Sequence, residues 1–382
     1  MKILMVLDHE FPTDVRVENE ATALIAAGHE VHIACYTQKE KPANEVFKSI
    51  QIHRVEISNL MYKLSAAALT LPFYFRFWFK FLDSLFKKYD FEAVHIHDLP
   101  LSKVGSRISK KYGVKLIIDL HENWPALLSV STHTSTLIGR MVSPNFLWVA
   151  YERRILKRAN AIIVVVDEAK ERISALGINK DKIFVVSNTL NMSEFDVDTE
   201  KPDSNHFTLY YAGGINFHRG LQTVIEAVEL AKDKVPNLRF HIAGFGSYRC
   251  NLEELVKKLD LADRIVFLGY LTLKDVARNL SQANVALIPH LKTPHTDSTI
   301  PHKLFQYMYI NKPIIASNCA PIERIVNETN SGVIFKSGDA NDLAKNIVQL
   351  ATKSIEVPSA RHWVEEKYCW DNDSKVLVEI YS

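Results

Sequence analysis

The pattern that most constrains the fold is an alternation of short apolar strands and amphipathic helices that begins at the N-terminus. Residues 3–7 predict a buried strand and residues 31–35 predict a second one. Between them, apolar residues recur at helical spacing after Asp14, which is a good N-cap, and the helix can end at Gly28. This strand–helix–strand unit predicts parallel strands that bind ligands at their carboxyl ends.

The alternation continues along the chain and is interrupted once, by residues 196–206, which are polar and lack periodicity. We interpret this stretch as an interdomain linker. A chain of 382 residues fits two domains. We therefore expect an α/β fold with one Rossmann-like domain over residues 1–196 and a second over residues 207–360. A D-x-D motif at residues 196–198 lies in the linker and follows no strand, so it predicts no metal site.

Composition limits the class of protein. Hydrophobic residues make up 47% of the chain and charged residues 24%, the balance of a soluble globular protein. A net charge of +2 argues against nucleic acid as a partner. Cys35, Cys250, Cys319 and Cys369 form no C-x-x-C pair, so we expect reduced cytosolic thiols. The N-terminal residues predict a strand rather than a signal peptide.

Residues 69–88 form an unusual segment. Seven aromatic residues lie between Phe73 and Phe81, with basic residues interleaved. That is more aromatic surface than one face of a helix can bury, yet the segment is too short and too charged to span a bilayer. Two interpretations remain: a core helix packed on the sheet, or an interfacial helix with its basic groups on anionic lipid.

A histidine and a carboxylate stand together at the carboxyl end of each of two successive predicted strands. The first ends in His97 and Asp98, and the second is followed by His121 and Glu122. Ligands of parallel sheets bind at this edge. A histidine at a strand end is more often structural than catalytic, so the residues alone leave both roles open.

Glycines follow two predicted strands in the second half of the chain. Gly213 and Gly214 lie between a strand and a helix, with Arg219 after them, and Gly244 follows the next strand. Glycines at such positions let backbone amides approach phosphate oxygens, which Arg219 could clamp.

Residues 295–318 predict a loop, a short helix that begins at Pro301, and a buried strand. Proline suits the first turn of a helix, and Lys303 and Gln306 share one helical face. The helix N-terminus would attract a phosphate, and Lys303 would add a positive charge beside it. A nucleoside diphosphate could bind here; the alternative is a surface loop followed by an ordinary core helix.

The run P-H-K-L-F-Q-Y-M at residues 301–308, followed by N-K-P-I-I-A at residues 311–316, resembles the P-N-K-L-F-E-Y-M … G-K-P-V-I-A signature of retaining glycosyltransferases of family 4. The resemblance covers nearly the whole chain and implies the GT-B architecture, in which two Rossmann-like domains face each other across a cleft. It also implies that residues 361–382 form a helix that packs back on the first domain.

The resemblance further implies roles for single residues. His121 would position the donor sugar and steady developing positive charge, while Arg219 and Lys303 would stabilise the departing diphosphate. Asp14 would contribute to the acceptor site, although an N-cap alone explains its presence equally well. The matching donor-binding positions are Gly213, Gly214, Gly244, Ser298, Thr299, Ile300 and Gln306, and the matching acceptor-binding positions are Asp14, Arg16, His97 and Asp98.

Three positions depart from the family pattern. Gly214 stands where the family often has arginine, and Ser298 and Gln306 stand where it has an acidic pair. A neutral acceptor such as Gln306 binds a ribose hydroxyl less strongly than a carboxylate does. A silent sugar-nucleotide binder therefore stays open as an alternative, as does an epimerase, for which His121 and Glu122 are the nearest acid–base pair.

The implied reaction moves a sugar from a nucleotide-diphosphate sugar to an acceptor hydroxyl with retention of anomeric configuration, without a metal or other cofactor. The expected acceptor is a polysaccharide or a lipid-linked glycan. The expected location is the cytoplasm, at the inner face of the membrane if residues 69–88 contact lipid.

Overall fold

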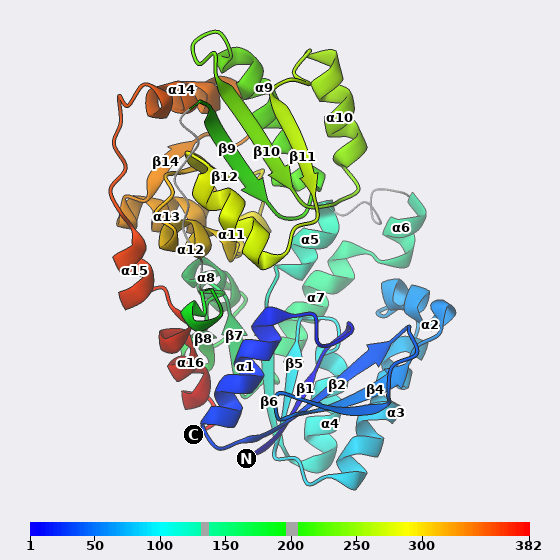
Figure 1. Ribbon diagram of the computed structural model, residues 1–382. Helices are drawn as coiled ribbons and strands as arrows, with labels where there is room; N and C mark the ends of the chain where they lie inside the picture. Colours follow the sequence, from blue (N-terminus) through cyan, green and yellow to red (C-terminus); the bar gives the residue numbers. More distant parts are fainter. Residues whose placement is uncertain (131–136, 196–204) are drawn as a thin grey trace. The chain divides into compact units, whose positions relative to one another are not determined.

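The computed structural model describes residues 1–130, 137–195 and 205–382. It divides into two compact units, Met1–Asn188 with Asp371–Ser382, and Thr189–Trp370 (Figure 1). The division at residues 188 and 189 lies before the expected domain boundary at residue 196. Most of the expected linker and the whole D-x-D motif lie outside the described residues.

The first unit is built on an eight-stranded sheet in the order β3-β4-β2-β1-β5-β6-β7-β8. All neighbouring strands pair in parallel except β3 and β4. The chain order reverses between β1 and β5, and ligands bind beyond the carboxyl ends of strands at such a reversal. The strands are β1 Lys2–Val6, β2 Glu30–Thr37, β3 Asn44–Phe47, β4 Ile50–Glu56, β5 Ala93–His97, β6 Lys115–Leu120, β7 Ala161–Val164 and β8 Ile183–Val185.

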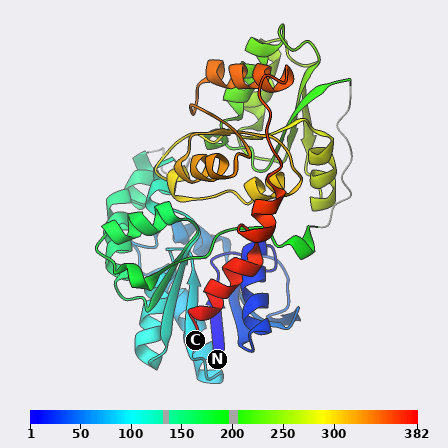
Figure 2. The ribbon, with the colours of Figure 1, turned by 90° about the vertical axis from the view of Figure 1, so that its left-hand side faces the viewer.

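Helices cover this sheet and include the chain's last one, α16. After α16, the hydroxyl of Tyr381 lies 2.8 Å from Nδ1 of His95 on β5. The two termini lie close together in this unit (Figure 2). The expected single tail helix over residues 361–382 is instead two helices, and only residues 371–382 group with the first unit, while α15, Arg361–Glu366, groups with the second. The helices are α1 Val15–Ala26, α2 Asn59–Leu64, α3 Phe73–Lys88, α4 Ser102–Tyr112, α5 Trp124–Val130, α6 Leu137–Val142, α7 Asn145–Leu156, α8 Asp167–Ala175 and α16 Trp370–Glu379.

Helix α3 carries the aromatic segment. It buries one face, on which Tyr74, Trp78 and Leu82 follow one another at intervals of four residues. Phe73, at its start, is half exposed. The core interpretation is confirmed for the buried face, while a lipid contact by the rest stays a prediction. No helix within the described residues is both long and apolar enough to cross a membrane.

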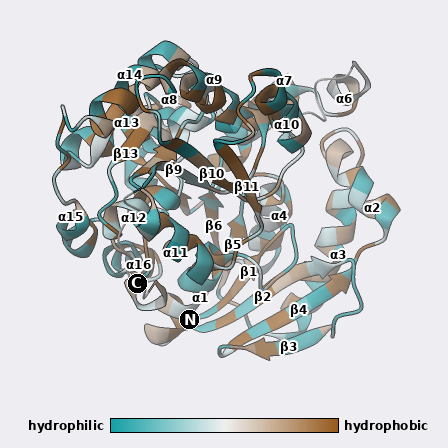
Figure 3. Ribbon diagram, turned by 45° about the horizontal axis from the view of Figure 1, so that its top comes forward, coloured by the Kyte–Doolittle hydropathy of each residue, from teal (hydrophilic) through white to brown (hydrophobic). Residues whose placement is uncertain are grey.

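The second unit is built on a six-stranded sheet in the order β11-β10-β9-β12-β13-β14, and its neighbouring strands all pair in parallel. Figure 3 shows mainly hydrophobic strands β9 and β10 beside a hydrophilic α11. The strands are β9 Phe207–Ala212, β10 Leu238–Ala243, β11 Ile265–Gly269, β12 Val285–Ile288, β13 Ile314–Ser317 and β14 Gly332–Phe335. The helices are α9 Leu221–Ala231, α10 Arg249–Lys258, α11 Leu273–Gln282, α12 Lys303–Tyr309, α13 Ala320–Thr329, α14 Ala340–Ala351 and α15 Arg361–Glu366.

Candidate functional site

Two glycine-containing loops meet at the carboxyl ends of β9 and β10. Gly213 has φ +143° and Gly244 has φ +130°, values that side chains rarely allow. A Cβ atom on Gly244 would lie 1.9 Å from the carbonyl oxygen of Gly213. Only glycines let the two loops approach this closely, so the expected loop pair is present.

Lys303, the first residue of α12, packs against the first of these loops. Its Nζ lies 3.8 Å from the centroid of the Tyr211 ring, and a Cβ on Gly213 would be 2.6 Å from that Nζ. Within the described residues Lys303 has no hydrogen-bond or ion-pair partner for its ammonium group. Burial, and then the positive charge of Arg219, hold the pKa of Lys303 well below its ordinary value.

Arg219 ends a short 3₁₀ helix, Phe217–Arg219, that follows the same loop. Its Nη1 donates to Nε2 of His290 over 3.1 Å. Burial, together with nearby positive charges, holds the pKa of His290 well below its ordinary value, so this ring is a neutral acceptor. Arg219 and Lys303 are thus close enough for their charges to interact, and neither has an acidic partner among the described residues; such a pair of cations favours an anion.

The remaining donor-binding candidates lie in the same unit, where they are buried or form hydrogen bonds within the protein. The Ser298 hydroxyl donates to the carbonyl of Pro294 and that of Thr299 to the carbonyl of His295. Ile300 is buried. Gln306 is also nearly buried, on α12, and Gly214 is exposed with its carbonyl accepting from Tyr211. Donor contacts by these residues stay predictions.

The expected helix start at Pro301 is wrong by two residues. The amide of Leu304 bonds the carbonyl of Pro301 in a turn, and α12 begins at Lys303 and has only seven residues. The positive end of so short a helix is a weak source of phosphate affinity. The side-chain charges of Lys303 and Arg219 therefore carry the argument for an anion site.

An exposed aromatic pair at the same edge of the sheet was not anticipated from the sequence. Phe245 follows Gly244, and Tyr270 follows the end of β11; they are 59% and 74% exposed. Their rings stack with centroids 6.3 Å apart and 6° between the planes. The sequence does not predict this pair, because Phe245 and Tyr270 come together only through the pairing of β10 with β11.

In the first unit, the expected edge residues surround a buried carboxylate, Asp119. His121 Nε2 lies 2.7 Å from Oδ2 of Asp119, and His97 Nδ1 lies 3.3 Å from the same oxygen. The guanidinium of Arg16 contacts Asp119 at 3.1 Å and Glu20 at 3.0 Å. Asp119 stands second from the end of an apolar strand, so the sequence analysis counted it as part of that strand.

Two acceptor-binding candidates of this unit have structural contacts. Arg16 is buried, and besides its carboxylate partners its Nη1 donates to the carbonyl of Val186 over 3.0 Å. Its guanidinium is therefore held by interior partners, and its acceptor role stays a prediction. Asp14 is the N-cap of α1 and accepts from the amides of Arg16 and Val17, as its sequence position predicts. Its acceptor role stays a prediction.

The surroundings of His121 favour its charged form. Burial disfavours its charged form, but the carboxylates of Asp119 and Asp98 raise the pKa of His121 to about 10. An imidazolium repels positive charge on a sugar ring. A protonated His121 is suited instead to donate an N–H to an oxygen, and its Nδ1 lies 3.8 Å from Oδ2 of Asp98.

Glu20, His95, His97 and Asp119 could together hold a metal ion, because their ligand atoms lie within 4.8 Å of one another. The Arg16 guanidinium already contacts both carboxylates, and the protonated His121 adds a second positive charge. Because charge in this cluster is balanced by the protein's own cations, we assign no metal to it.

Asp8, at the end of β1, is a further perturbed group that the sequence analysis missed. The hydroxyl of Tyr74 on α3 donates to its carboxylate. Burial raises the pKa of Asp8 to about 7, against the lowering effect of that hydrogen bond. A single aspartate after a strand is common, so the sequence around Asp8 does not predict that its pKa is raised.

The raised pKa of Asp8 predicts a pH-dependent stability. Between about pH 4 and pH 7 the unfolded chain ionises while the folded carboxyl stays protonated, so stability falls as the pH rises. We expect Asp8→Asn to stabilise the protein by roughly 1–2 kcal/mol more at pH 8 than at pH 4. Thermal unfolding at both pH values tests this; a gain of equal size at pH 4 would contradict it.

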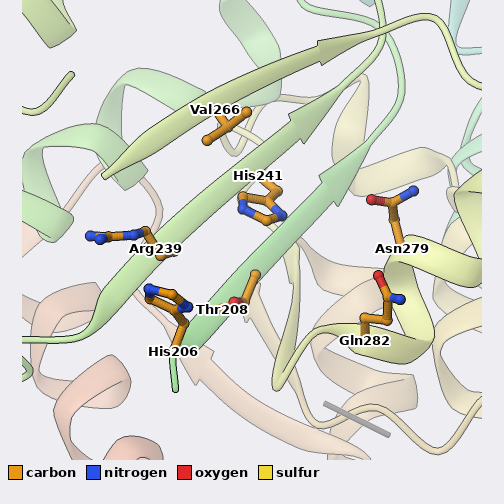
Figure 4. A pocket seen from close by; sticks show the side chains of 7 residues that line it. All are labelled: His206, Thr208, Arg239, His241, Val266, Asn279 and Gln282. Atoms are coloured by element: carbon orange, nitrogen blue, oxygen red, sulfur yellow. The ribbon is translucent and has the colours of Figure 1, made fainter. Parts of the chain in front are cut away.

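The second unit also contains a cavity of about 510 Å³. Figure 4 shows Thr208, Arg239 and Val266 lining it, each near the start of its strand, together with side chains of α11. The glycine loops follow the other ends of these strands. This cavity is therefore at the opposite end of the sheet from Lys303 and Arg219 and is distinct from the candidate anion site.

Comparison with known proteins agrees with this geometry. The model of Glycosyltransferase Family 4 matches residues 14–194, and that of Glycosyl transferases group 1 matches residues 192–370. An uncharacterized glycosyltransferase of Methanocaldococcus jannaschii is 22% identical over 410 residues, with 100% of this chain and 98% of that protein covered.

Solved structures show the same fold. Sucrose-phosphate synthase from Thermosynechococcus elongatus has a TM-score of 0.81 at 18% identity, covering 100% of this chain and 98% of that one. The Anabaena protein HepE in complex with UDP has a TM-score of 0.72 at 12% identity, covering 100% and 99%. Two parallel-sheet α/β units with these neighbours have the GT-B fold, as expected from the sequence.

Proposed function

Because the chain belongs to the glycosyltransferases of the GT-B fold, we propose that it transfers a sugar from a nucleotide-diphosphate donor to an acceptor hydroxyl with retention of anomeric configuration. The observation that carries this proposal is the pair of cations, Arg219 and Lys303, beside the glycine loops and without an acidic partner in the described residues.

The two cations match the charge that develops in such a reaction. The bond between the anomeric carbon and the donor phosphate breaks, the acceptor oxygen bonds to that carbon, and the leaving phosphate oxygen takes the acceptor proton. Negative charge grows on the leaving diphosphate, and fixed cations stabilise it most in a site that excludes water. Arg219 and Lys303 would supply that stabilisation directly, so the proposed mechanism uses no metal.

His121 would act in turnover and not in nucleotide binding, since it lies in the other unit. As an imidazolium held by Asp119, it would donate a hydrogen bond to a sugar or acceptor oxygen. The variant His121→Ala should lower kcat while the dissociation constant of a nucleoside diphosphate stays unchanged. A parallel loss of nucleotide affinity would contradict this role.

The acceptor class is supported by the names of relatives. Glycosyltransferases of Erwinia amylovora and Salmonella typhimurium that match about half of this chain are named for the biosynthesis of amylovoran and colanic acid. We therefore propose a polysaccharide or its lipid-linked precursor as the acceptor.

The proposal is tested by turnover. Purified protein would be screened by thermal shift against nucleoside diphosphates and then assayed with the matching nucleotide sugars and glycan acceptors. Nuclear magnetic resonance of the product reports whether the anomeric configuration is retained. Binding without turnover would favour the silent binder, and release of free sugar without an acceptor would favour the epimerase.

The exposed aromatic pair offers a platform for the nucleobase of the donor. A base can stack on Phe245 or Tyr270 because both follow strands at the edge that carries the glycine loops. Stacking on an aromatic ring contributes about 1–3 kcal/mol per base. We expect Phe245→Ala to weaken nucleoside diphosphate binding about tenfold by calorimetry and to leave inorganic pyrophosphate binding unchanged. Equal loss for both ligands would exclude a base contact.

A further inference from the structure

The sheet of the second unit has one face that is only partly covered. Along β10, Leu238 and Phe240 belong to the hydrophobic core. Because successive side chains of a strand point to opposite faces, Arg239 and His241 lie on the other face. There α11 packs against β9, while Val266 of β11 is 40% exposed. The cavity of about 510 Å³ lies where this helix leaves the sheet uncovered.

The residues that line this cavity are mostly polar, and none of them is acidic. Three are basic or titratable, three carry a hydroxyl or an amide group, and one is apolar. Cavities of about 300–1,000 Å³ hold small-molecule ligands. A single apolar side chain offers little surface to an acyl chain or a flat base, so the cavity suits a small polar ligand. The lining residues are Arg239, His206 and His241, then Thr208, Asn279 and Gln282, and finally Val266.

Arg239 is the permanently charged group of the cavity. Within the described residues its guanidinium has no ion-pair partner and makes one long hydrogen bond, 3.4 Å from Nη1 to the carbonyl of the neighbouring Leu238. A guanidinium has several further N–H donors, which a ligand can use. The acidic residue of α11, Asp275, is engaged elsewhere, because its carboxylate accepts from the hydroxyl of Thr272 over 2.6 Å. The charge of Arg239 is therefore available to an anion.

Two imidazoles lie close to this guanidinium. The ring of His241 has no hydrogen-bond or ion-pair partner in the part of the chain that the structure describes. Burial, followed by the positive charges of His206 and Arg239, lowers the pKa of His241. The three groups are thus near enough for their charges to interact. An anion among them would relieve their mutual repulsion and would accept hydrogen bonds from all three.

Neutral polar groups line another part of the cavity. Thr208 is 7% exposed, and its hydroxyl has no hydrogen-bond partner among the described residues. The amide of Asn279 donates to the carbonyl of Asp275 over 2.8 Å, which leaves its Oδ1 as an acceptor. Figure 4 shows Asn279 on α11 across the cavity from Arg239 and His241 on β10. A hydroxyl and an amide oxygen can bind the hydroxyl groups of a ligand whose anionic end is held by β10.

We propose that this cavity binds a sugar phosphate, with the phosphate on Arg239 and the two imidazoles and the sugar hydroxyls on Thr208 and Asn279. A phosphate has more acceptor oxygens than a carboxylate, so it matches three neighbouring donors better. The cavity lies at the opposite end of the strands from Lys303 and Arg219, so its ligand should not compete with the sugar donor. The proposal concerns binding alone and does not rest on the sugar-transfer reaction.

Calorimetry of the full chain tests the proposal, with glucose 6-phosphate, fructose 6-phosphate and ribose 5-phosphate as probes and saturating UDP present. At least one probe should bind saturably and about tenfold more tightly than inorganic phosphate. Arg239→Ala should weaken that binding about tenfold or more, through the loss of hydrogen bonds between charged groups. Asn279→Ala should weaken it several-fold and leave inorganic phosphate binding unchanged. No saturable binding of any probe at millimolar concentration would overturn the proposal.

Lys257→Ala is the matched control, because it also removes one positive charge from the second unit. Lys257 is exposed in the last turn of α10, and its neighbour Val256 packs in the hydrophobic core on the opposite face of the sheet. This variant should keep sugar phosphate affinity within about twofold. Equal loss in Lys257→Ala and Arg239→Ala would mean that net charge alone is responsible. Equal affinity for inorganic phosphate and the sugar phosphates would mean an adventitious anion site. Either result would overturn the proposal.

Binding at the donor site is excluded by a reciprocal pair of variants. Lys303→Met should weaken UDP binding and leave sugar phosphate binding unchanged, whereas Arg239→Ala should do the reverse. An unchanged thermal unfolding transition shows that Arg239→Ala is folded, and Arg239→Lys, which keeps the charge without the planar fork, should give a smaller loss. Loss of sugar phosphate binding in Lys303→Met alone would overturn the proposal. A chain that binds a sugar phosphate as expected but fails every turnover assay would remove only the proposed function.

Discussion

Asp119→Asn is expected to destabilise the first unit by about 3 kcal/mol, although it replaces one buried polar side chain with another of the same size. Asp119 is fully buried and holds both Arg16 and His121. These two cations hold the pKa of Asp119 well below its ordinary value despite burial. Removing the charge leaves the cations poorly compensated, and such losses cost about 3–5 kcal/mol.

Glu20→Gln is the matched control, because Glu20 is buried in the same cluster and also contacts Arg16. Burial and the charge of Asp119 raise the pKa of Glu20 well above its ordinary value, which favours its protonated form more than that of Asp119. Its amide replacement should cost less than about 1 kcal/mol. In Asp119→Asn, ionisation of Glu20 can replace part of the lost charge, which puts the expected cost at the lower end of the range.

Chemical unfolding at pH 7 measures both variants, and hydrogen exchange of β5 and β6 localises the effect. The pH dependence gives a second check. The folded pKa of His121 is raised to about 10, so its stabilising contribution is complete below about pH 6.5 and is lost as the pH rises through 10. Asp119→Asn should remove that alkaline loss. Equal destabilisation by Asp119→Asn and Glu20→Gln would mean that the negative charge is shared between them.

The fold was predictable because its signals are local. Strand and helix periodicity, Asp14 as a cap and the glycines after strands each act within a few residues, and the parallel sheets follow from their order. The aromatic segment was ambiguous for a physical reason. Its sequence shows more apolar surface than one face can bury, and only packing decides that Tyr74 and Trp78 are inside.

The charge network was not predictable for the opposite reason. Arg16 and Asp119 are 103 residues apart, and Tyr381 reaches His95 from 286 residues away. No local pattern marks Asp119 as the centre of the cluster, and the charge of His121 follows from that neighbour. The sequence located the edge where these groups lie, but their protonation states depend on contacts that only the fold creates.

Lys303→Met is expected to have two opposite effects, and together they distinguish a functional cation from a structural one. The unliganded protein should become more stable by roughly 1–2 kcal/mol, because the change removes a partly buried ammonium that has no hydrogen-bond or ion-pair partner in the described residues. Nucleoside diphosphate affinity should fall about 10–100-fold, the loss of a hydrogen bond to a charged group. Arg219→Ala should weaken binding by a similar factor.

Lys312→Met provides the control within the same unit. Burial lowers the pKa of Lys312 to about 8, as burial also lowers that of Lys303, but its Nζ donates to the carbonyl of Ala283 over 2.8 Å. Removing it should destabilise the protein and leave nucleotide affinity unchanged. Thermal unfolding with and without UDP, and calorimetry with UDP, GDP and ADP, measure both quantities. If Lys303→Met destabilised the unliganded protein and left every affinity unchanged, Lys303 would be a structural lysine like Lys312, and the anion site would lose the observation on which it rests.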